Sequence, residues 1–449
     1  MANEKENNKA NETVMAHIYQ LDGRVPIGAA VPFGLQHILA MFVANIAPIV
    51  IVAGVCGFST AEVAKLIQSA MIIAGIGTLI QLFPIWRVGS GLPIVMGISF
   101  TFVNVFCYLG PVYGYETIMG AVLVGGIIEG ILGLFAKYWM RIITPIVSAS
   151  VVTAIGFSLL PVGAASFGGG NGASDFGSVK NWILGSITLF VCLVFHILAK
   201  GFLKQLSVLT GLFVGYIIAI PMGMVDFSGI LSGGVIAPPR IFPYHYEFNI
   251  KAILAVTSIF LVSATETIGD TSALVNAGLG RDVTREEIQG SLACDGFISA
   301  LSSLFGCLPI TSFSQNVGLV AMTKVVNRIA IATGAVIMIL AGFFPVLGNL
   351  LATLPSAVLG GCTIMMFGNI VVSGVQMIGN CGFSQRNITI LAISLGIGIG
   401  FTQMPELFSI FPKIVQNIFA ENCVAVVFIL AILLNLVLPK EAVSDKREN

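Results

Sequence analysis

The tripeptide Leu92-Pro93-Ile94 opens a short apolar segment, and the same tripeptide, Leu308-Pro309-Ile310, opens a second one about 216 residues later. Proline donates no backbone hydrogen bond, and the residue before a proline disfavours the helical conformation. Both segments are therefore unsuited to an uninterrupted helix. We predict that residues 93–100 and 309–315 are extended and that a short half-helix follows each of them. The alternative is that both segments are helices kinked at proline.

The composition around these two segments is that of a membrane protein. Hydrophobic residues make up 56% of the 449 residues and charged residues only 9%, whereas a soluble domain has about 25% charged residues. So few polar groups cannot cover a surface that faces water. The formal net charge of +0 gives no electrostatic support for nucleic-acid binding.

Apolar segments recur along the whole chain and predict an all-α polytopic protein with about fourteen membrane spans. The segments are 31–55, 63–84, 91–109, 115–137, 141–163, 180–199, 206–223, 251–276, 288–308, 309–323, 328–352, 355–378, 387–404 and 420–438. With a cytoplasmic N-terminus, about 16 of the 21 Lys and Arg residues lie on the inner side, as the positive-inside rule requires. We therefore predict a protein of the cell membrane with both termini in the cytoplasm.

Two further matches indicate an internal duplication. Gly120-Ala121-Val122 recurs as Gly334-Ala335-Val336 after about 214 residues, and Pro145 corresponds to Pro355 after about 210 residues. Seven spans in each copy is an odd number, so the two copies face opposite ways, which is the 7+7 inverted repeat of many secondary transporters. In such folds, interrupted segments in matching positions mark the binding site. The two extended pieces should meet near mid-membrane, with the half-helix N-termini directed at the ligand.

Ionisable residues are rare in the predicted spans, and each needs a reason because burying a charge is costly. Glu266 and Asp270 lie four residues apart in the eighth span, so they share one face of a helix. Asp270 could instead be a solvated charge near a helix end. Asp295 and His37 could be either site residues or ordinary buried polar groups. Glu129 is predicted to have a structural role.

The motifs of the common enzyme classes are missing from the sequence. It contains no HExxH, no GxxxxGK[ST] and no Cys/His cluster with metal-ligand spacing. The eight cysteines are scattered and form no CxxC pair, so we expect them to be apolar packing residues. We predict that the protein is not an enzyme and needs no metal or cofactor. Without a nucleotide site, transport would be driven by an ion gradient or be passive.

The stretch Gln315-Asn316-Val317-Gly318-Leu319-Val320-Ala321-Met322-Thr323-Lys324 resembles the signature of the nucleobase–ascorbate transporter family. Gln36-His37 resembles the Gln-His pair in the first span of that family. Thr265-Glu266-Thr267 through Asp270 is similar to its acidic eighth span, and Asp295 to its ninth-span aspartate. The resemblance covers essentially the whole chain.

The family resemblance implies a fold of two parts, a core that holds the substrate and a gate. The predicted parts are a cytoplasmic tail (1–24), the core (25–138 and 251–353), the gate (139–224 and 354–438), an extracytoplasmic loop (225–250) and a second cytoplasmic tail (439–449). The resemblance also suggests a homodimer formed through the gate. It implies that Glu266 and Gln315 hold the substrate between the third and tenth segments.

Position 315 bears on the identity of the substrate. In this family, uracil permeases resemble one another in having Glu there, and xanthine or uric acid permeases in having Gln. The carboxamide of Gln315 both donates and accepts, which suits the adjacent N–H and C=O of an oxidised purine. Further substrate contacts are expected from Ser99, Phe100, Phe102, Phe313, Asn316 and Gly318, with Phe100 or Phe313 stacking on the ring. His37, Gln36, Asp270 and Asp295 are expected to support the site and the coupling.

We therefore expect a symporter that imports xanthine or uric acid together with a cation, H+ rather than Na+. A uracil permease of the same family is the first alternative. An anion exchanger or channel of the sulfate/bicarbonate type is the alternative from another class. That alternative would need a positive site between the half-helices, where this sequence has Gln315, Asn316 and a nearby glutamate instead.

Overall fold

A computed structural model describes residues 17–231, 234–412, 416, 419–420 and 422–439, which are mostly α-helical. Most of the two predicted cytoplasmic tails lies outside these described residues. Among the described helices, seven are long and apolar enough to cross a membrane. They are α2 (Ile27–Val55), α3 (Thr60–Leu82), α5 (Tyr115–Leu134), α7 (Pro145–Phe167), α8 (Val179–Leu198), α11 (Ile250–Leu274, continued by a π-helical turn, Val275–Leu279) and α16 (Ser356–Cys381). The chain is therefore a polytopic membrane protein, as predicted.

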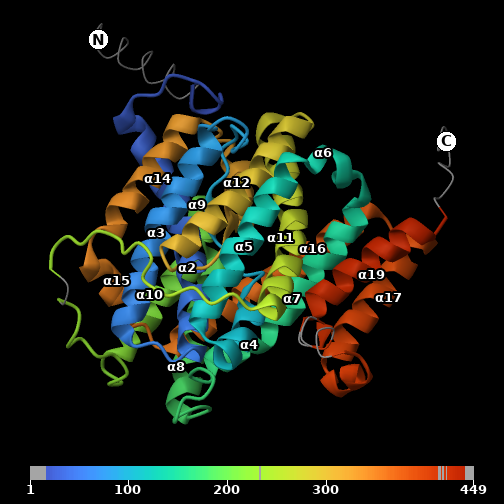
Figure 1. The fold of residues 1–449 in the computed structure, drawn as a ribbon. Helices are drawn as coiled ribbons and strands as arrows, with labels where there is room; N and C mark the ends of the chain where they lie inside the picture. Colours follow the sequence, from blue (N-terminus) through green and yellow to red (C-terminus); the bar gives the residue numbers. More distant parts are fainter. Residues whose placement is uncertain (1–16, 232–233, 413–415, 417–418, 421, 440–449) are drawn as a thin grey trace, which may run out of the picture.

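The other helices are shorter or more polar and complete the bundle (Figure 1). They include α4 (Val103–Tyr113), α6 (Ala136–Trp139), α9 (Phe202–Gln205), α10 (Ser207–Ala219), α12 (Arg285–Leu304), α13 (Ser314–Thr323), α14 (Arg328–Gly342), α15 (Pro345–Ala352), α17 (Gln385–Thr402) and α19 (Cys423–Val437). The connection between α10 and α11 contains no helix among its described residues, in agreement with the predicted loop. It crosses the outside of the bundle in Figure 1.

The two proline-containing segments form one small sheet in the interior. Strand β1 (Met96–Ile98) pairs antiparallel with β2 (Ile310–Ser312), and Gly97 lies opposite Thr311. Both strands fall within the predicted extended pieces, and the short helices α4 and α13 follow them. Gly97 is required for this close approach, because a Cβ there would lie 2.3 Å from the Phe313 ring.

The outer edges of this two-stranded sheet would leave backbone groups without partners at membrane depth, where no lipid can satisfy them. Polar side chains from the surrounding helices supply those partners. The N–H of Ile98 donates to Oδ1 of Asn45 (2.9 Å), and the N–H of Met96 donates to Oγ1 of Thr78 (3.0 Å). On the other strand, the Ser299 hydroxyl accepts from the N–H of Ile310 at 3.0 Å. The helices therefore hold the extended backbone in place.

The predicted span at 328–352 is not one continuous helix, because α14 and α15 meet at an angle of 82°. Pro345 is the first residue of α15, and Phe344 before it has an extended backbone (φ −98°, ψ 101°). A proline disfavours the helical conformation in the residue before it, which accounts for the break. Only if the bent pair is taken as one span does the number of candidate spans among the described residues rise to eight.

Glycines allow very close packing of helix pairs that are far apart in the sequence. A Cβ at Gly296 on α12 would lie 2.1 Å from the backbone nitrogen of Gly130 on α5. A Cβ at Gly360 on α16 would lie 2.1 Å from the backbone nitrogen of Phe167 on α7. Such small-residue contacts are typical of helices in membranes, where packing rather than water exclusion drives association.

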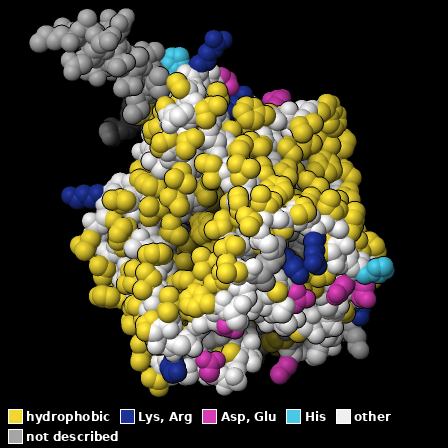
Figure 2. Space-filling view, turned by 90° about the vertical axis from the view of Figure 1, so that its left-hand side faces the viewer, with side chains coloured by type: hydrophobic (Ala, Val, Ile, Leu, Met, Phe, Trp, Pro, Cys, Tyr) yellow, Lys and Arg dark blue, Asp and Glu magenta, His cyan; other side chains and the backbone are white. Residues whose placement is uncertain are grey.

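The outer surface carries many large hydrophobic side chains. Phe190, Ile197 and Phe213 are each more than 60% exposed. Figure 2 shows that hydrophobic side chains cover most of the face in view, while charged side chains are few. An apolar surface of this extent is suited to contact with lipid acyl chains rather than with water.

Candidate functional site

A cavity of about 530 Å³ lies between two groups of elements. The strand pair, α2, α11 and α13 form one wall, and α7, α10 and α16 form the other. The predicted site residues that line this cavity are Ser99, Phe100, Glu266, Asp270, Phe313, Gln315 and Gly318. The broken segments and the acidic helix α11 therefore meet at one place.

Glu266 is tied to the first broken segment. Its Oε2 atom accepts a hydrogen bond of 2.8 Å from the hydroxyl of Thr101, in the turn between β1 and α4. No other hydrogen bond to this side chain is found among the described residues. A carboxylate offers about four acceptor positions, so Glu266 retains acceptor capacity toward the cavity.

Asp270, one helical turn further along α11, is tied to the second broken segment. Its carboxylate accepts from the hydroxyl of Ser312 at 3.0 Å and from that of Ser314 at 2.8 Å. Asp270 lines the cavity and is not a charge at a free helix end, because α11 and its π-helical turn continue to Leu279. Helix α11 thus presents one carboxyl group to each broken segment.

Asp295 lies behind the sheet and does not line the cavity. It is fully buried on α12, and its Oδ2 atom accepts from the hydroxyls of Thr311 (3.0 Å) and Thr267. Gln81 of α3 donates to its Oδ1 atom at 3.4 Å. These bonds join β2 to three helices, so this geometry makes Asp295 a positioning residue for the second strand.

His37 and Asn316 form a buried pair that also stays out of the cavity lining. The amide Nδ2 atom of Asn316 donates to the backbone oxygen of His37 (3.0 Å) and lies 3.1 Å from its Nδ1 atom. This contact joins α2 to the first turn of α13. Gln36 is half-buried on α2 and does not line the cavity either. The expected contact between Asn316 and a substrate therefore has no counterpart in this geometry.

Gln315 projects from the first turn of α13 into the cavity and forms no side-chain hydrogen bond with any other described residue. Phe313 and Phe100 also line the cavity. The ring of Phe100 packs edge-to-face against that of Phe367, with 5.3 Å between the ring centroids. A free carboxamide in a cavity that two aromatic rings also line can bind a flat polar ligand.

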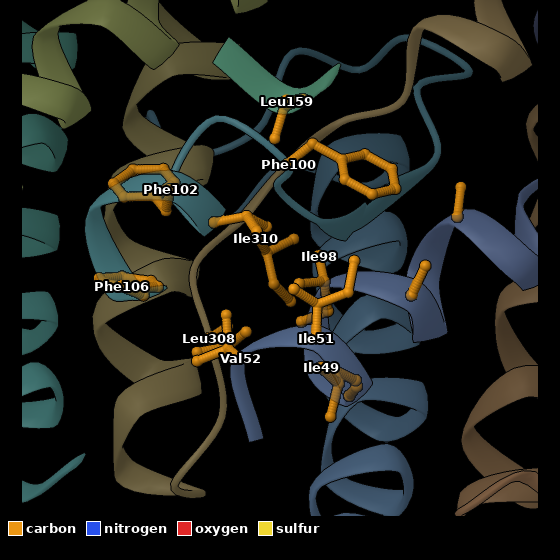
Figure 3. Packing of buried hydrophobic residues seen from close by; sticks show 14 of the residues in the cluster. Ile49, Ile51, Val52, Ile98, Phe100, Phe102, Phe106, Leu159, Leu308 and Ile310 are labelled. Atoms are coloured by element: carbon orange, nitrogen blue, oxygen red, sulfur yellow. The ribbon is translucent and has the colours of Figure 1, made fainter. Parts of the chain in front are cut away.

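Phe102 does not reach the cavity, contrary to the expectation from sequence. Its ring is 1% exposed and packs against Phe260 at 4.6 Å and Phe106 at 5.7 Å between centroids. In Figure 3, Phe102 and Phe106 lie together on one side, whereas Phe100 lies on the other, near Leu159. The backbone of Phe102 is already helical (φ −88°, ψ −14°), which turns its side chain away from that of Phe100.

The opposite wall of the cavity contains polar residues that the sequence reasoning missed. Asn369, Ser373, Gln376 and Asn380 of α16 all line it. Their spacing of four, three and four residues places them in one stripe along a helix. This helical spacing of polar residues along an apolar segment is the sequence pattern from which the polar face could have been predicted.

A membrane-embedded cavity built on broken segments and polar side chains is typical of a transporter. The family model described as "Permease family" (Xan_ur_permease) matches residues 28–407. The chain belongs to this permease family.

Relatives that match nearly the whole chain support the same assignment. The xanthine permease XanQ of Escherichia coli K12 is 36% identical over 438 residues, which cover 94% of each chain. The uric acid permease PucK of Bacillus subtilis 168 is 34% identical over 379 residues, which cover 84% of this chain and 88% of PucK. The predicted family and the likeness to xanthine and uric acid permeases are confirmed. Members of this family are permeases, not enzymes.

Solved structures of other transporters share the fold. The transmembrane domain of the cyanobacterial bicarbonate transporter BicA has a TM-score of 0.58 and 16% identity, covering 90% of this chain and 96% of that one. The murine anion transporter Slc26a9 has a TM-score of 0.54 and 14% identity, covering 87% and 68%. At these identities the likeness concerns the fold alone.

Proposed function

We propose that the protein imports an oxidised purine, xanthine or uric acid, by symport with a proton. The observation that carries this proposal is Gln315, a carboxamide without a protein partner among the described residues, in the cavity that Glu266 also lines. The names of the relatives, xanthine permease and uric acid permease, agree with it.

The arrangement of donors and acceptors suits an oxopurine. Gln315 binds the adjacent N–H and C=O of the purine through its own C=O and NH₂ groups. Glu266 accepts from another ring N–H. The backbone amides of Phe100 and of Ser314, at the start of α13, bind ring oxygens, because the N–H of Ser99 already donates to Pro309. Phe100 and Phe313 provide faces on which the ring stacks. Each contact uses a group that lines the cavity.

The proposed coupling uses the acidic face of α11. Glu266 binds the substrate and carries the proton, and Asp270 lies one turn away on the same face. Protonation neutralises Glu266. Because a charge is costly inside the membrane, neutralisation favours the movement of the core once substrate and proton are bound. His37 and Asp295 brace the elements that carry these groups.

The proposed architecture is the fourteen-span 7+7 inverted repeat, with the core at 25–138 and 251–353 rocking against the gate at 139–224 and 354–438. Support comes from the strand pair formed by matching segments of the two halves. The cavity reaches His196 and Lys204 at one end. The positive-inside assignment puts that end in the cytoplasm, so the cavity would face inward. A homodimer through the gate completes the proposal.

The experiment is uptake of labelled xanthine and uric acid in cells that lack their own purine transporters. We expect saturable uptake that a proton uncoupler abolishes and that uracil, sulfate and bicarbonate do not inhibit. Sodium-dependent uptake that resists the uncoupler would overturn the proton coupling. Competition by uracil at equal concentration would overturn the choice of substrate, and uptake of sulfate alone would indicate an anion transporter.

A further inference from the structure

The gate-side wall of the cavity carries a stripe of polar side chains along α16, beside the apolar lining residues Met366, Ile370 and Met377. Asn369, Ser373, Gln376 and Asn380 are the only Asn, Gln, Ser or Thr side chains of α16 after Thr363, and all four line the cavity. The stretch from Asn369 to Asn380 is twelve residues long, so its ends lie about 16 Å apart along the helix at 1.5 Å per residue step. Neighbouring exposed positions that do not line the cavity, Val372 and Val375, are apolar. After Thr363, the polarity of α16 is thus confined to its cavity face.

The stripe leads from the proposed purine site to the mouth of the cavity. At one end, Phe367 contacts the ring of Phe100 from the first broken segment, and Asn369 follows two residues later. At the other end, Asn380 is the second-last residue of α16. Lys204 and His196, which line the same cavity, come from the ends of elements on the gate side. A ligand that leaves Gln315 toward this mouth passes along the stripe.

The stripe has hydrogen-bonding capacity that the protein does not use. None of its four side chains forms a hydrogen bond with another described residue. Three of them are carboxamides, and each can donate and accept from adjacent atoms. Polar groups at membrane depth need partners from water or a ligand. Carboxamides offer the same pairing that Gln315 offers to an N–H beside a C=O.

The cavity is larger than one base requires. Its volume of about 530 Å³ lies in the range of about 300–1,000 Å³ that accommodates drug-sized ligands. A single bicyclic purine is smaller than a drug-sized ligand and fills only part of this volume. The space beside α16 can therefore hold a base that has already left the first site.

We propose that Gln376 and Asn380, with the rest of the stripe, form a second, weaker subsite for the same oxopurine on its path between the Glu266–Gln315 site and the mouth. This inference rests on the proposed function. A base at the second subsite exchanges one carboxamide partner for another, so it never has to cross an apolar stretch with its polar edge unpaired. The chemical class of the ligand is a neutral or anionic oxopurine with an N–H beside a C=O.

The test compares the double variant Gln376→Leu/Asn380→Leu with the control Gln385→Leu. Gln385 is an exposed residue at the start of α17 that does not line the cavity. Labelled xanthine transport is measured in inside-out and in right-side-out membrane vesicles, together with equilibrium xanthine binding by the purified protein. We expect the KM in inside-out vesicles to rise about tenfold in the double variant. We expect the KM in right-side-out vesicles and the equilibrium Kd to stay within about twofold.

Each result has one meaning. An inside-out KM equal to that of the Gln385→Leu control overturns the second subsite. An equal rise in KM on both sides and in Kd also overturns it, because the stripe would then belong to the first site. The Kd shows that the variant is folded, and the single variant Gln376→Leu, with a smaller expected rise, replaces the double variant if that one does not fold. If the unaltered protein transports neither xanthine nor uric acid, it is the proposed function that fails.

Discussion

Gln315 and Glu266 lie on different helices, and only the side chain of Glu266 has a described hydrogen-bond partner. Glu266 is fixed by a hydroxyl from the first broken segment, whereas the side chain of Gln315 lines the cavity without a described protein partner. The acidic pair on α11 was predictable from its four-residue spacing. The position of Phe102 was not, because the strand ends at Ile98 and the following turn reverses the direction of the side chain.

Gln315→Glu removes the NH₂ donor and places a second acceptor opposite the C=O of an oxopurine. We expect the affinity for xanthine to fall about 10- to 100-fold, since an unmatched buried polar group costs about 1–3 kcal/mol. Uracil should compete better against labelled xanthine in the variant than in the unaltered protein. The control is Gln385→Glu, the same change outside the cavity. Unchanged xanthine affinity in the variant would exclude Gln315 from the site.

Thr101→Val removes the hydroxyl that donates to Glu266 while the side chain keeps its shape. We expect the KM for xanthine to rise about fivefold, which corresponds to one hydrogen bond of about 1 kcal/mol. Thr210→Val is the matched control, because the only described partner of the Thr210 hydroxyl is the backbone oxygen of Leu206, the residue just before α10. Equal transport kinetics in the two variants would show that Thr101 does not position Glu266.

At the scale of elements, the strand pair is the feature that places the site in the fold. The proline in each segment predicted extended backbone, but the pairing of β1 with β2 depends on how two segments more than 200 residues apart meet in the fold. Pro345 also indicated a break, between α14 and α15. The single span was nevertheless predicted there because the whole stretch is apolar. The role of the polar stripe on α16 was not predicted from sequence. The spacing of its residues shows that they share one face of the helix, but not that this face lines the cavity.

Gly97→Ala tests the strand pair. The added methyl group would lie 2.3 Å from the Phe313 ring and 2.7 Å from Cε of Met41, so the strands or the ring must move. Overpacking of this kind costs about 1–3 kcal/mol. We expect a lower melting temperature and a loss of most xanthine transport. Gly396→Ala on α17, where nothing lies within 4 Å, is the control and should behave like the unaltered protein. A Gly97→Ala variant with normal transport would contradict the close approach at this site.

At the scale of the whole molecule, composition and span length alone predicted a polytopic membrane protein. The family signature at 315–324 predicted the permease family. Neither signal fixes the orientation in the membrane, which rests on the uneven distribution of Lys and Arg. Orientation decides whether the mouth near Lys204 opens to the cytoplasm.

An epitope tag in the connection between α10 and α11, inserted after Val235, should be reached by antibody in intact cells. A tag between Arg281 and Asp282 should be reached only after permeabilisation, because α11 crosses the membrane between the two positions. Two tags that label together would contradict the span assigned to α11. If only the tag between Arg281 and Asp282 is labelled in intact cells, the orientation in the membrane is the opposite of the one proposed.

The central claim is that an oxopurine binds in the cavity between Glu266 and Gln315. Its most direct test is calorimetric titration of xanthine into the purified protein, the variant Glu266→Gln and the control Glu406→Gln, which alters a glutamate outside the cavity lining. A Gln at this position offers one acceptor oxygen instead of two, and an unmatched buried polar group costs about 1–3 kcal/mol. We predict one saturable site for the unaltered protein and the control, and a Kd at least tenfold higher for Glu266→Gln. Equal xanthine affinity in all three proteins would contradict the claim.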